Sequence, residues 1–462
     1  MHDMTQGKPL RVIFSFAVSL LAANLMAAVY SLVDSVMVGR LVASEGIGAI
    51  GATASIVSTV STFGGGIVSG CGIVLGRYWG AGQKDRLRHT MANIWYLTAV
   101  MSLILTVGFV LLLRPLLRLT HVPEELAPMA LSYTYIIICT MPLSFIGNVF
   151  GTAFRSLGDS KTPLLTSLIG GAANVGYNYL FMRLIPLGIA GAAIGTACST
   201  GTSLLLNLFF FCRRLPLLRV RRAEAGLEMR EIGRLFLVGF PVGLLNSVTS
   251  ISSVILQDAV NRQGSAAVTG FATGDKVVGI TWTAIMTIET TLIFFDAQNR
   301  GAGNIGRIRQ GLRQTSFVML GVMAVVTLMV DLLGWRLFVP FVGQDEALLS
   351  IATEMARTQL CFFPFMVMLA MFRGTVQGMG YTAPAAICGV VELIARLIVS
   401  RVATTVRGLY FAGPAAWVLT TLFLVALYPV LLRRLYRRVE DEKRLRALSE
   451  SAATGSPKKD LM

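Results

Sequence analysis

The chain has 462 residues, a formal net charge of +16, 54% hydrophobic residues and only 14% charged residues. Soluble domains carry about 25% charged residues, and the mean hydropathy of this chain is +0.69. These values exclude an ordinary soluble protein and indicate a membrane protein.

Twelve apolar runs follow one another along the chain. A run of about 20 apolar residues is long enough to cross a bilayer as a helix. Because lipid offers no partners to backbone N–H and C=O groups, such runs cross it as α-helices. We therefore expect an all-α membrane protein with twelve transmembrane helices. The runs are 12–39, 47–75, 90–113, 129–154, 163–184, 188–212, 233–260, 267–298, 313–338, 348–372, 384–406 and 409–432.

The positive charge is distributed unevenly between the connections. If the N-terminus is cytoplasmic, 29 of the 40 Lys and Arg residues fall on the cytoplasmic side, a count that includes Arg155 and Arg373. An excess of Lys and Arg in cytoplasmic loops is the usual pattern of membrane proteins. We therefore expect both termini in the cytoplasm, and we interpret the charge as a topology signal rather than as a nucleic-acid-binding surface.

The two halves of the chain repeat each other. Cys139-Thr-Met-Pro142 recurs as Cys361-Phe-Phe-Pro364, 222 residues later, and Gly80-Ala-Gly82 recurs as Gly301-Ala-Gly303, 221 residues later. Because the order of the motifs is kept, we infer a duplicated six-helix unit. Internal repeats of this kind are common in secondary transporters.

The repeat and the polar segments divide the chain into four parts. We expect two pseudo-symmetric six-helix lobes, a polar linker between them and a basic, mostly disordered cytoplasmic tail. The boundaries are 1–212 for the N-lobe, 213–231 for the linker, 232–432 for the C-lobe and 433–462 for the tail.

Polar side chains within the apolar runs of the N-terminal half are candidates for function, because they are costly in a membrane. Asp34 has no Lys or Arg near it in its own run, so it is neutral, hydrated or bound to a cation. Asn174 and Asn178 are spaced four residues apart and share a helix face, and Thr196 adds a hydroxyl in the next run. Amide and hydroxyl oxygens suit a hard cation, although membrane asparagines also serve helix packing.

The C-terminal half carries charged residues instead. Glu392 and Arg396 stand where the repeat has Asn174 and Asn178, and their spacing suits an intrahelical ion pair. A structural pair is favoured there over a substrate site. Asp275, Lys276 and Glu289 are secondary candidates, with Glu289 the most isolated of the acids and a second candidate for cation or substrate contact. Asp296 is expected to be solvated near the helix end.

The sequence lacks the motifs of several kinds of enzyme and of metal-binding proteins. The chain has no Gly-Lys-Ser/Thr phosphate loop, no nucleophile constellation and no metal spacing among its six cysteines. We therefore expect a protein that is not an enzyme, uses no cofactor and draws its energy from an ion gradient.

The ordered motifs resemble the multidrug and toxin extrusion (MATE) family, within the branch similar to NorM and DinF proteins. The resemblance covers roughly 10–430 and rests on Tyr30-Ser-Leu-Val-Asp34, Arg155-Ser-Leu-Gly-Asp-Ser-Lys-Thr-Pro163, Gly239-Phe-Pro-Val-Gly243, Gln298-Asn-Arg-Gly-Ala-Gly303 and Glu392-Leu-Ile-Ala-Arg396, among others. It implies a V-shaped pair of six-helix lobes and alternating access.

The resemblance also implies a cation site and a function. Carried over by residue, the family's N-lobe cation site falls on Asp34, Asn174, Asn178 and Thr196, which would hold Na⁺ or a proton. Some members have aspartate where this chain has Asn178, and a proline that bends the first helix in some members would fall at Ser19.

The function expected from the resemblance is an antiporter that exports amphipathic, often cationic, organic compounds in exchange for Na⁺ or H⁺. The alternative is a flippase for lipid-linked precursors. We expect a monomer in the bacterial inner membrane, in contact with membrane lipid and small-molecule substrates but not with nucleic acid.

Overall fold

A computed structural model describes residues 3–42, 44–119, 126–219 and 226–454. These described parts are helical throughout, without strands. The helices of the first half are α1 (Pro9–Leu41), α2 (Ser44–Gly80), α3 (Lys84–Leu119), α4 (Ala127–Ser156), α5 (Lys161–Tyr179), continued by the π-helix η1 (Leu180–Leu184), and α6 (Gly188–Arg214). The helices of the second half are α7 (Met229–Asn261), α8 (Ser265–Gly301), α9 (Ile305–Leu333), α10 (Val339–Val342), α11 (Glu346–Cys361), α12 (Phe363–Gly378), α13 (Thr382–Val402), α14 (Val406–Leu409) and α15 (Ala412–Thr454).

The expected twelve-helix membrane fold is confirmed. In the described residues, ten helices are long and apolar enough to cross a membrane, and α11 and α12 together form an eleventh span that is bent by 50°. The shorter α5, with 19 residues, takes the remaining place among the twelve. The expected single helix 348–372 is broken at Phe362 because Pro364, at the start of α12, cannot donate a backbone hydrogen bond.

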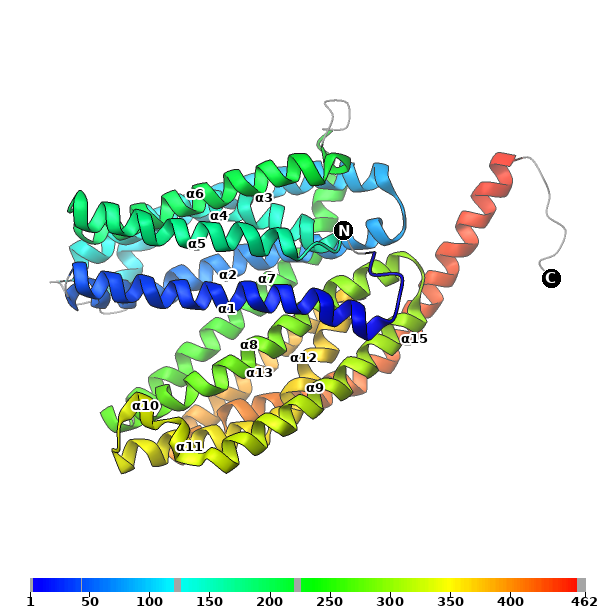
Figure 1. Cartoon of the computed structure of the whole chain (residues 1–462). Coiled ribbons are helices and arrows are strands. Elements are labelled where there is room, and N and C mark those ends of the chain that lie inside the picture. Colours follow the sequence, from blue (N-terminus) through cyan, green and yellow to red (C-terminus); the bar gives the residue numbers. More distant parts are fainter. Residues whose placement is uncertain (1–2, 43, 120–125, 220–225, 455–462) are drawn as a thin grey trace.

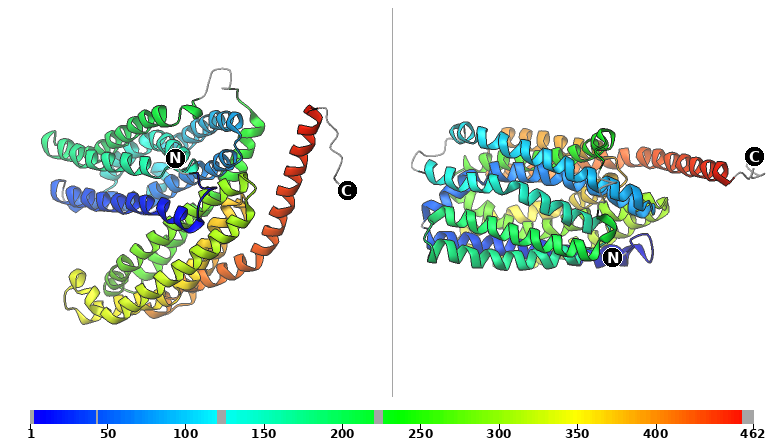
Figure 2. Two further views of the ribbon diagram at one scale, coloured as in Figure 1. Left: turned by 45° about the vertical axis from the view of Figure 1, so that its right-hand side comes forward. Right: turned by 90° about the horizontal axis from the view of Figure 1, so that it is seen from above.

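The long helices form two bundles that diverge from one end of the molecule to the other (Figure 1). One bundle, the N-lobe, contains α1–α6, and the other, the C-lobe, contains α7–α15. The described N-terminal segment lies at the end where the lobes meet, and the left view of Figure 2 shows the same V shape. We call this end the closed end and the opposite end the open end.

Two mirrored glycine contacts join the lobes at the closed end. A Cβ atom on Gly80, the last residue of α2, would collide with the carbonyl oxygen of Gln298 on α8. A Cβ atom on Gly301, the last residue of α8, would collide with the carbonyl oxygen of Arg77 on α2. Because 301 − 80 and 298 − 77 both equal 221, each contact is the repeat mate of the other.

A second glycine seam runs between α2 and α7. Added Cβ atoms on Gly66 and Gly70 would lie 2.6 and 2.5 Å from the Cα atoms of Gly243 and Gly239. Both helices therefore present a Gly-x-x-x-Gly pair at the point of closest approach. Small residues at this spacing let membrane helices pack backbone against backbone.

The N-terminal segment and Gln298 add polar contacts at the closed end. The backbone N–H of Met4 donates to Gln298 Oε1 over 3.1 Å, and Gln298 Nε2 donates to the carbonyl oxygen of Ser156 over 2.8 Å. Arg307 Nη1 donates to the carbonyl oxygen of Gly7 over 2.7 Å. Residues before α1 are thus bound to α8 and α9 of the other lobe.

The C-terminal tail differs from the expectation of disorder. α15 continues as one helix to Thr454, so the prediction for 433–462 does not hold for 433–454; residues 455–462 lie outside the described residues. Leu431, Leu435 and Val439 are all buried at four-residue spacing and pack against the C-lobe core. Beyond them, Glu442 forms an ion pair of 2.7 Å with Arg77 of the N-lobe.

The α2–α7 seam makes a prediction about stability. Gly70→Ala would force the helices apart, because the new methyl group has no room beside Gly239, and we expect destabilisation by about 1–3 kcal/mol. Gly279→Ala is the control, since a Cβ atom there meets nothing within 4 Å. Thermal unfolding in detergent measures both. Equal melting temperatures for the two variants would contradict the tight seam.

Candidate functional site

The four primary candidates from the sequence lie together in the N-lobe. Asp34, Asn174 and Thr196 line one cavity of about 520 Å³ between α1, α4, α5 and α6, which we call the N-lobe cavity. Asn178 is fully buried and donates from Nδ2 to Asp34 Oδ1. Three helices therefore bring to one place residues that are up to 162 positions apart (196 − 34).

A chain of hydrogen bonds fixes the two asparagines. Asn178 Nδ2 also donates to Asn174 Oδ1 over 3.1 Å, and Asn174 Nδ2 donates to Ser199 Oγ over 3.3 Å. The other end of the Asn178 amide, Oδ1, is buried without a hydrogen-bond partner among the described residues and packs on Gly195. The site thus holds one amide oxygen whose bonding capacity is unused.

Asp34 is partly exposed to the N-lobe cavity. Among the residues that the structure describes, its hydrogen-bond partner is Asn178, and it forms no ion pair with Lys or Arg. Tyr133 of α4 lies within electrostatic range of it. An ionised carboxylate held by one amide in this setting is a strong acceptor for a proton or a metal cation.

Local helix geometry supports this arrangement. α5 changes to the π-helix η1 at Leu180, directly after Asn178 and Tyr179. Single π turns inside α-helices occur often at functional sites. The Tyr30 ring lies against Gly171 of α5, and its hydroxyl donates to the Leu168 carbonyl oxygen over 3.1 Å, which fixes α1 on α5 beside Asp34.

The N-lobe cavity also contains a residue that sequence reasoning assigned to a loop. Arg155 lines the cavity from α4 and donates to Thr152 Oγ1 over 3.3 Å. In the sequence, Arg155 belongs to the count of cytoplasmic residues and to a longer family motif, and no local signal marks it as a cavity residue.

The C-lobe candidates form a buried charge network instead of an open site. Arg373 of α12 binds both oxygens of Glu289, with Nε–Oε1 and Nη2–Oε2 distances of 2.7 and 2.8 Å. Its Nη1 also donates to Glu392 Oε1 over 2.9 Å. The positive-inside count had placed Arg373 in a cytoplasmic connection; that placement is wrong, because Arg373 is only 5% exposed.

The predicted pair on α13 is the weaker part of this network. Arg396 Nη2 lies 3.8 Å from Glu392 Oε2, and its Nη1 donates to Ser252 Oγ of α7 over 3.2 Å. The interpretation of Glu289 as the most isolated acid is also wrong, since its carboxylate forms a bidentate ion pair with Arg373. The network is neutral overall, with two acids and two arginines.

Asp275 and Lys276 lie outside this network. Both side chains are exposed on α8, and Asp275 is within electrostatic range of Arg396. Lys276 Nζ lies 4.9 Å from the centre of the Phe341 ring, so it makes a cation–π contact and does not approach Glu289.

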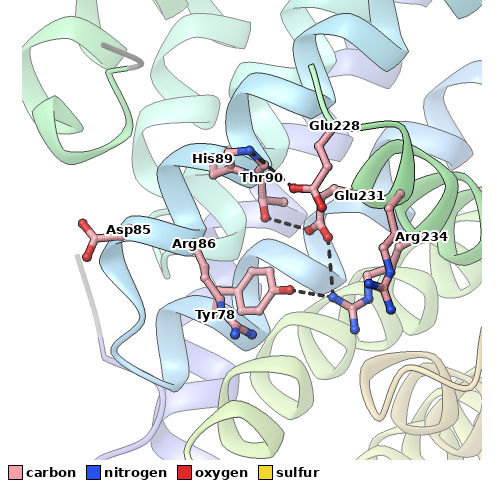
Figure 3. A pocket seen from close by; sticks show the side chains of 9 residues that line it. Tyr78, Asp85, Arg86, His89, Thr90, Glu228, Glu231 and Arg234 are labelled. Atoms are coloured by element: carbon pink, nitrogen blue, oxygen red, sulfur yellow. Dashed lines mark hydrogen bonds and ion pairs between the residues drawn. The ribbon is translucent and has the colours of Figure 1, made fainter. Parts of the chain in front are cut away.

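Another pocket lies near the closed end, away from the candidate site residues of either lobe. It has about 810 Å³ and is lined by Tyr78, Arg86, His89, Glu231, Arg234 and their neighbours on α2, α3 and the start of α7 (Figure 3). Arg234 Nη1 donates to the Tyr78 hydroxyl over 3.0 Å, and Glu231 accepts from Thr90 over 3.0 Å. Acidic and basic groups bind each other here, so the pocket offers no single charge to a ligand.

The charge network makes a prediction about stability. Glu289→Gln leaves Arg373 and Arg396 with Glu392 as their remaining acid in the network, and removing one partner from a buried ion pair costs about 3–5 kcal/mol. Asp331→Asn is a matched control, because Asp331 pairs with Arg357 at 3.1 Å while both side chains are about half exposed; such surface pairs contribute about 0–1 kcal/mol. Chemical or thermal unfolding in detergent should separate the two variants. A similar small loss in both would contradict the buried network.

Comparisons with known proteins agree with the repeat and the fold. The MatE family model matches residues 20–180 and 241–402, and these matches begin 221 and end 222 residues apart (241 − 20; 402 − 180). The probable multidrug resistance protein YpnP of Bacillus subtilis (strain 168) is 28% identical over 386 residues, which cover 82% of this chain and 84% of that protein. An FAD transporter of Shewanella oneidensis is 23% identical over 315 residues, covering 67% of this chain and 70% of that protein.

The likeness to solved structures extends over nearly the whole chain. A MATE crystal structure in the bent conformation superposes with a TM-score of 0.87 at 16% identity, covering 95% of this chain and 98% of that chain. The expectation that the protein is not an enzyme agrees with these relatives. The two family matches cover most of the sequence, and the chain belongs to the MatE family.

Proposed function

We propose that the protein is a secondary antiporter that exports amphipathic, often cationic, organic compounds in exchange for Na⁺ or H⁺ by alternating access. The observation that carries the proposal is the position of Asp34, a carboxylate that forms no ion pair within the described residues and faces the N-lobe cavity beside Asn174, Asn178 and Thr196. Family membership and the name of the Bacillus relative support drug export.

The orientation and setting belong to the same proposal. The protein would lie in the bacterial inner membrane as a monomer surrounded by lipid, with both termini in the cytoplasm, as the distribution of Lys and Arg suggests. The closed end would then be cytoplasmic, and the lobes would diverge toward the outside.

Coupling follows from competition for one carboxylate. When Asp34 is ionised, it is held by the Asn178 amide; a proton or Na⁺ arriving from the outside neutralises it and relieves the cost of a charge inside the membrane. Binding of a cationic compound favours the ionised form, so drug and coupling ion favour opposite states of Asp34. A coupling ion that binds the two lobe arrangements with different affinity shifts the equilibrium between them.

Sodium and proton make different demands on the asparagines. Na⁺ requires several oxygen ligands, but Asn178 presents its NH₂ group to Asp34. Sodium binding would therefore need the Asn178 amide to turn, so that the unpartnered Oδ1 replaces Nδ2. A proton needs no such rotation, and the asparagines would then serve only to position Asp34.

Export of lipid-linked precursors is less favoured. The buried arginines Arg373 and Arg396 share the acids Glu289 and Glu392, so they do not offer a free positive site to a phosphate group.

The test is efflux of a fluorescent organic cation from proteoliposomes under an imposed sodium gradient and, separately, an imposed proton gradient. We expect Asp34→Asn to reduce ion-driven efflux to the level of empty liposomes, because the amide cannot change charge, while insertion and thermal stability stay normal. Asp258→Asn is the control: Asp258 lies near the repeat counterpart of Asp34 and forms an exposed ion pair of 2.6 Å with Arg262. Full activity of Asp34→Asn would refute the proposal.

The ion is assigned by a second variant. Asn178→Leu removes the amide oxygen, so sodium-driven efflux should fall with it, whereas proton-driven efflux should persist with altered pH dependence.

A further inference from the structure

Asp296 of α8 is a buried acid that the N-lobe mechanism does not use. Sequence reasoning expected it to be solvated, but its side chain is 0% exposed. Neither carboxyl oxygen has a hydrogen-bond partner in the described residues. The side chain faces α12, where a Cβ atom added to Gly378 would lie 2.7 Å from the Asp296 Cβ atom. An isolated ionised carboxylate is too costly in such a place, and the group becomes neutral instead.

The groups around Asp296 supply hydroxyls rather than charges. α12 places the Thr375 hydroxyl beside the carboxyl without the geometry of a hydrogen bond, and α15 places the Tyr428 phenol near it. Both hydroxyl oxygens are themselves buried and have no hydrogen-bond partner in the part of the chain that the structure describes. Arg309 of α9 lies within electrostatic range of Tyr428. This cluster has room for hydrogen bonds that a protonated carboxyl can donate and accept.

The nearby charged residues are bound elsewhere. Arg373, two residues before Thr375, is held by Glu289 and Glu392. Arg77 of α2 pairs with Glu442, and Arg300 of α8 donates to the Met379 carbonyl oxygen. No arginine or lysine in the described part of the chain forms an ion pair with Asp296, so a proton is the means of neutralising it.

A cavity leads from the Tyr428 side chain toward the closed end. It has about 920 Å³ and lies between α9, α12, α15 and the start of α1. Its lining is mostly apolar, and α9 adds the polar residues Arg309, Gln310, Arg313, Gln314 and Ser316. Gln314 Oε1 and Ser316 Oγ are buried without a hydrogen-bond partner among the described residues. The α9 side of this space, with its unused hydrogen-bonding groups, suits ordered water.

We infer that Asp296 is a proton-binding site of the C-lobe, separate from the Asp34 site, and that it exchanges its proton through this cavity by way of Tyr428. A proton fits better than Na⁺, because Thr375 and Tyr428 add only two oxygens to the carboxyl, fewer than a hard cation takes. The inference is independent of the ion that Asp34 binds.

The site lies next to the contact between the lobes. Ala297, the next residue of α8, packs against Gly76 of α2, and Gln298 donates to the Ser156 carbonyl oxygen. Loss of the proton would place an unpaired charge one residue from this contact. The protonated form therefore favours the closed arrangement of α2 and α8.

The test is infrared spectroscopy of the purified full-length protein before and after transfer from H₂O to D₂O. A protonated carboxyl group absorbs apart from carboxylates and amides, and its band shifts on deuteration. We expect the wild type to show such a shifting band, Asp296→Asn to lose that component, and Asp34→Asn to retain it. An unchanged spectrum in Asp296→Asn, or a band that does not shift in D₂O, would overturn the inference.

Two further variants keep the test decisive if Asp296→Asn does not fold. Thr375→Val is nearly isosteric and should change the frequency of the band, because it removes the adjacent hydroxyl. Tyr428→Phe should slow the exchange with D₂O. An unaltered frequency in the first variant would reject the assignment to Asp296, and an unaltered rate in the second would reject the route through Tyr428.

Discussion

The arrangement of the lobes depends on the backbone contact between the ends of α2 and α8. Gly80 lies against the Gln298 carbonyl and Gly301 lies against the Arg77 carbonyl, so any side chain at either glycine would separate the lobes. Gln298 then connects three segments, because it accepts from Met4 and donates to Ser156. The approach of the helices at this end sets the angle at which they diverge toward the other end (Figure 1).

The two lobes share a scaffold but use their interior polar residues differently. In the N-lobe, Asn174 and Asn178 surround a carboxylate that remains open to a cavity. At the corresponding place in the repeat, Glu392 and Arg396 belong to a charge network that Arg373 closes. The attraction within a buried ion pair offsets the cost of removing its charges from water only when every charge has a partner. The C-lobe network, in which each charge has one, is therefore suited to a structural role in a rigid interior. The unmatched acid of the N-lobe suits exchange of a small cation.

Sequence patterns predicted the helices and much of the N-lobe site. Apolar runs identify membrane helices because the bilayer admits few alternatives, and Asn174 and Asn178 were close in sequence on one face. The partners of Arg373 could not be predicted, since Glu289 and Glu392 are 84 and 19 residues away from it along the chain. Asp296 was misjudged for the same reason: its burial results from the packing of α12 and α15, which no pattern within α8 reports. The α15 extension was missed although Leu431, Leu435 and Val439 carry the four-residue spacing of a helix face.

The glycine seam between α2 and α7 has a consequence for the speed of the proposed switching between lobe arrangements. Gly66, Gly70, Gly239 and Gly243 contribute no side-chain torsions of their own, so few side chains, among them Ile67 and Asn246, lie at the point of closest approach. The attraction there is the sum of many weak dispersion contacts, which change gradually with displacement. If the lobes alternate as proposed, the directional bonds of Gln298, Arg307 and Glu442 must break, and we expect these bonds to contribute more to the activation barrier than the glycine seam does.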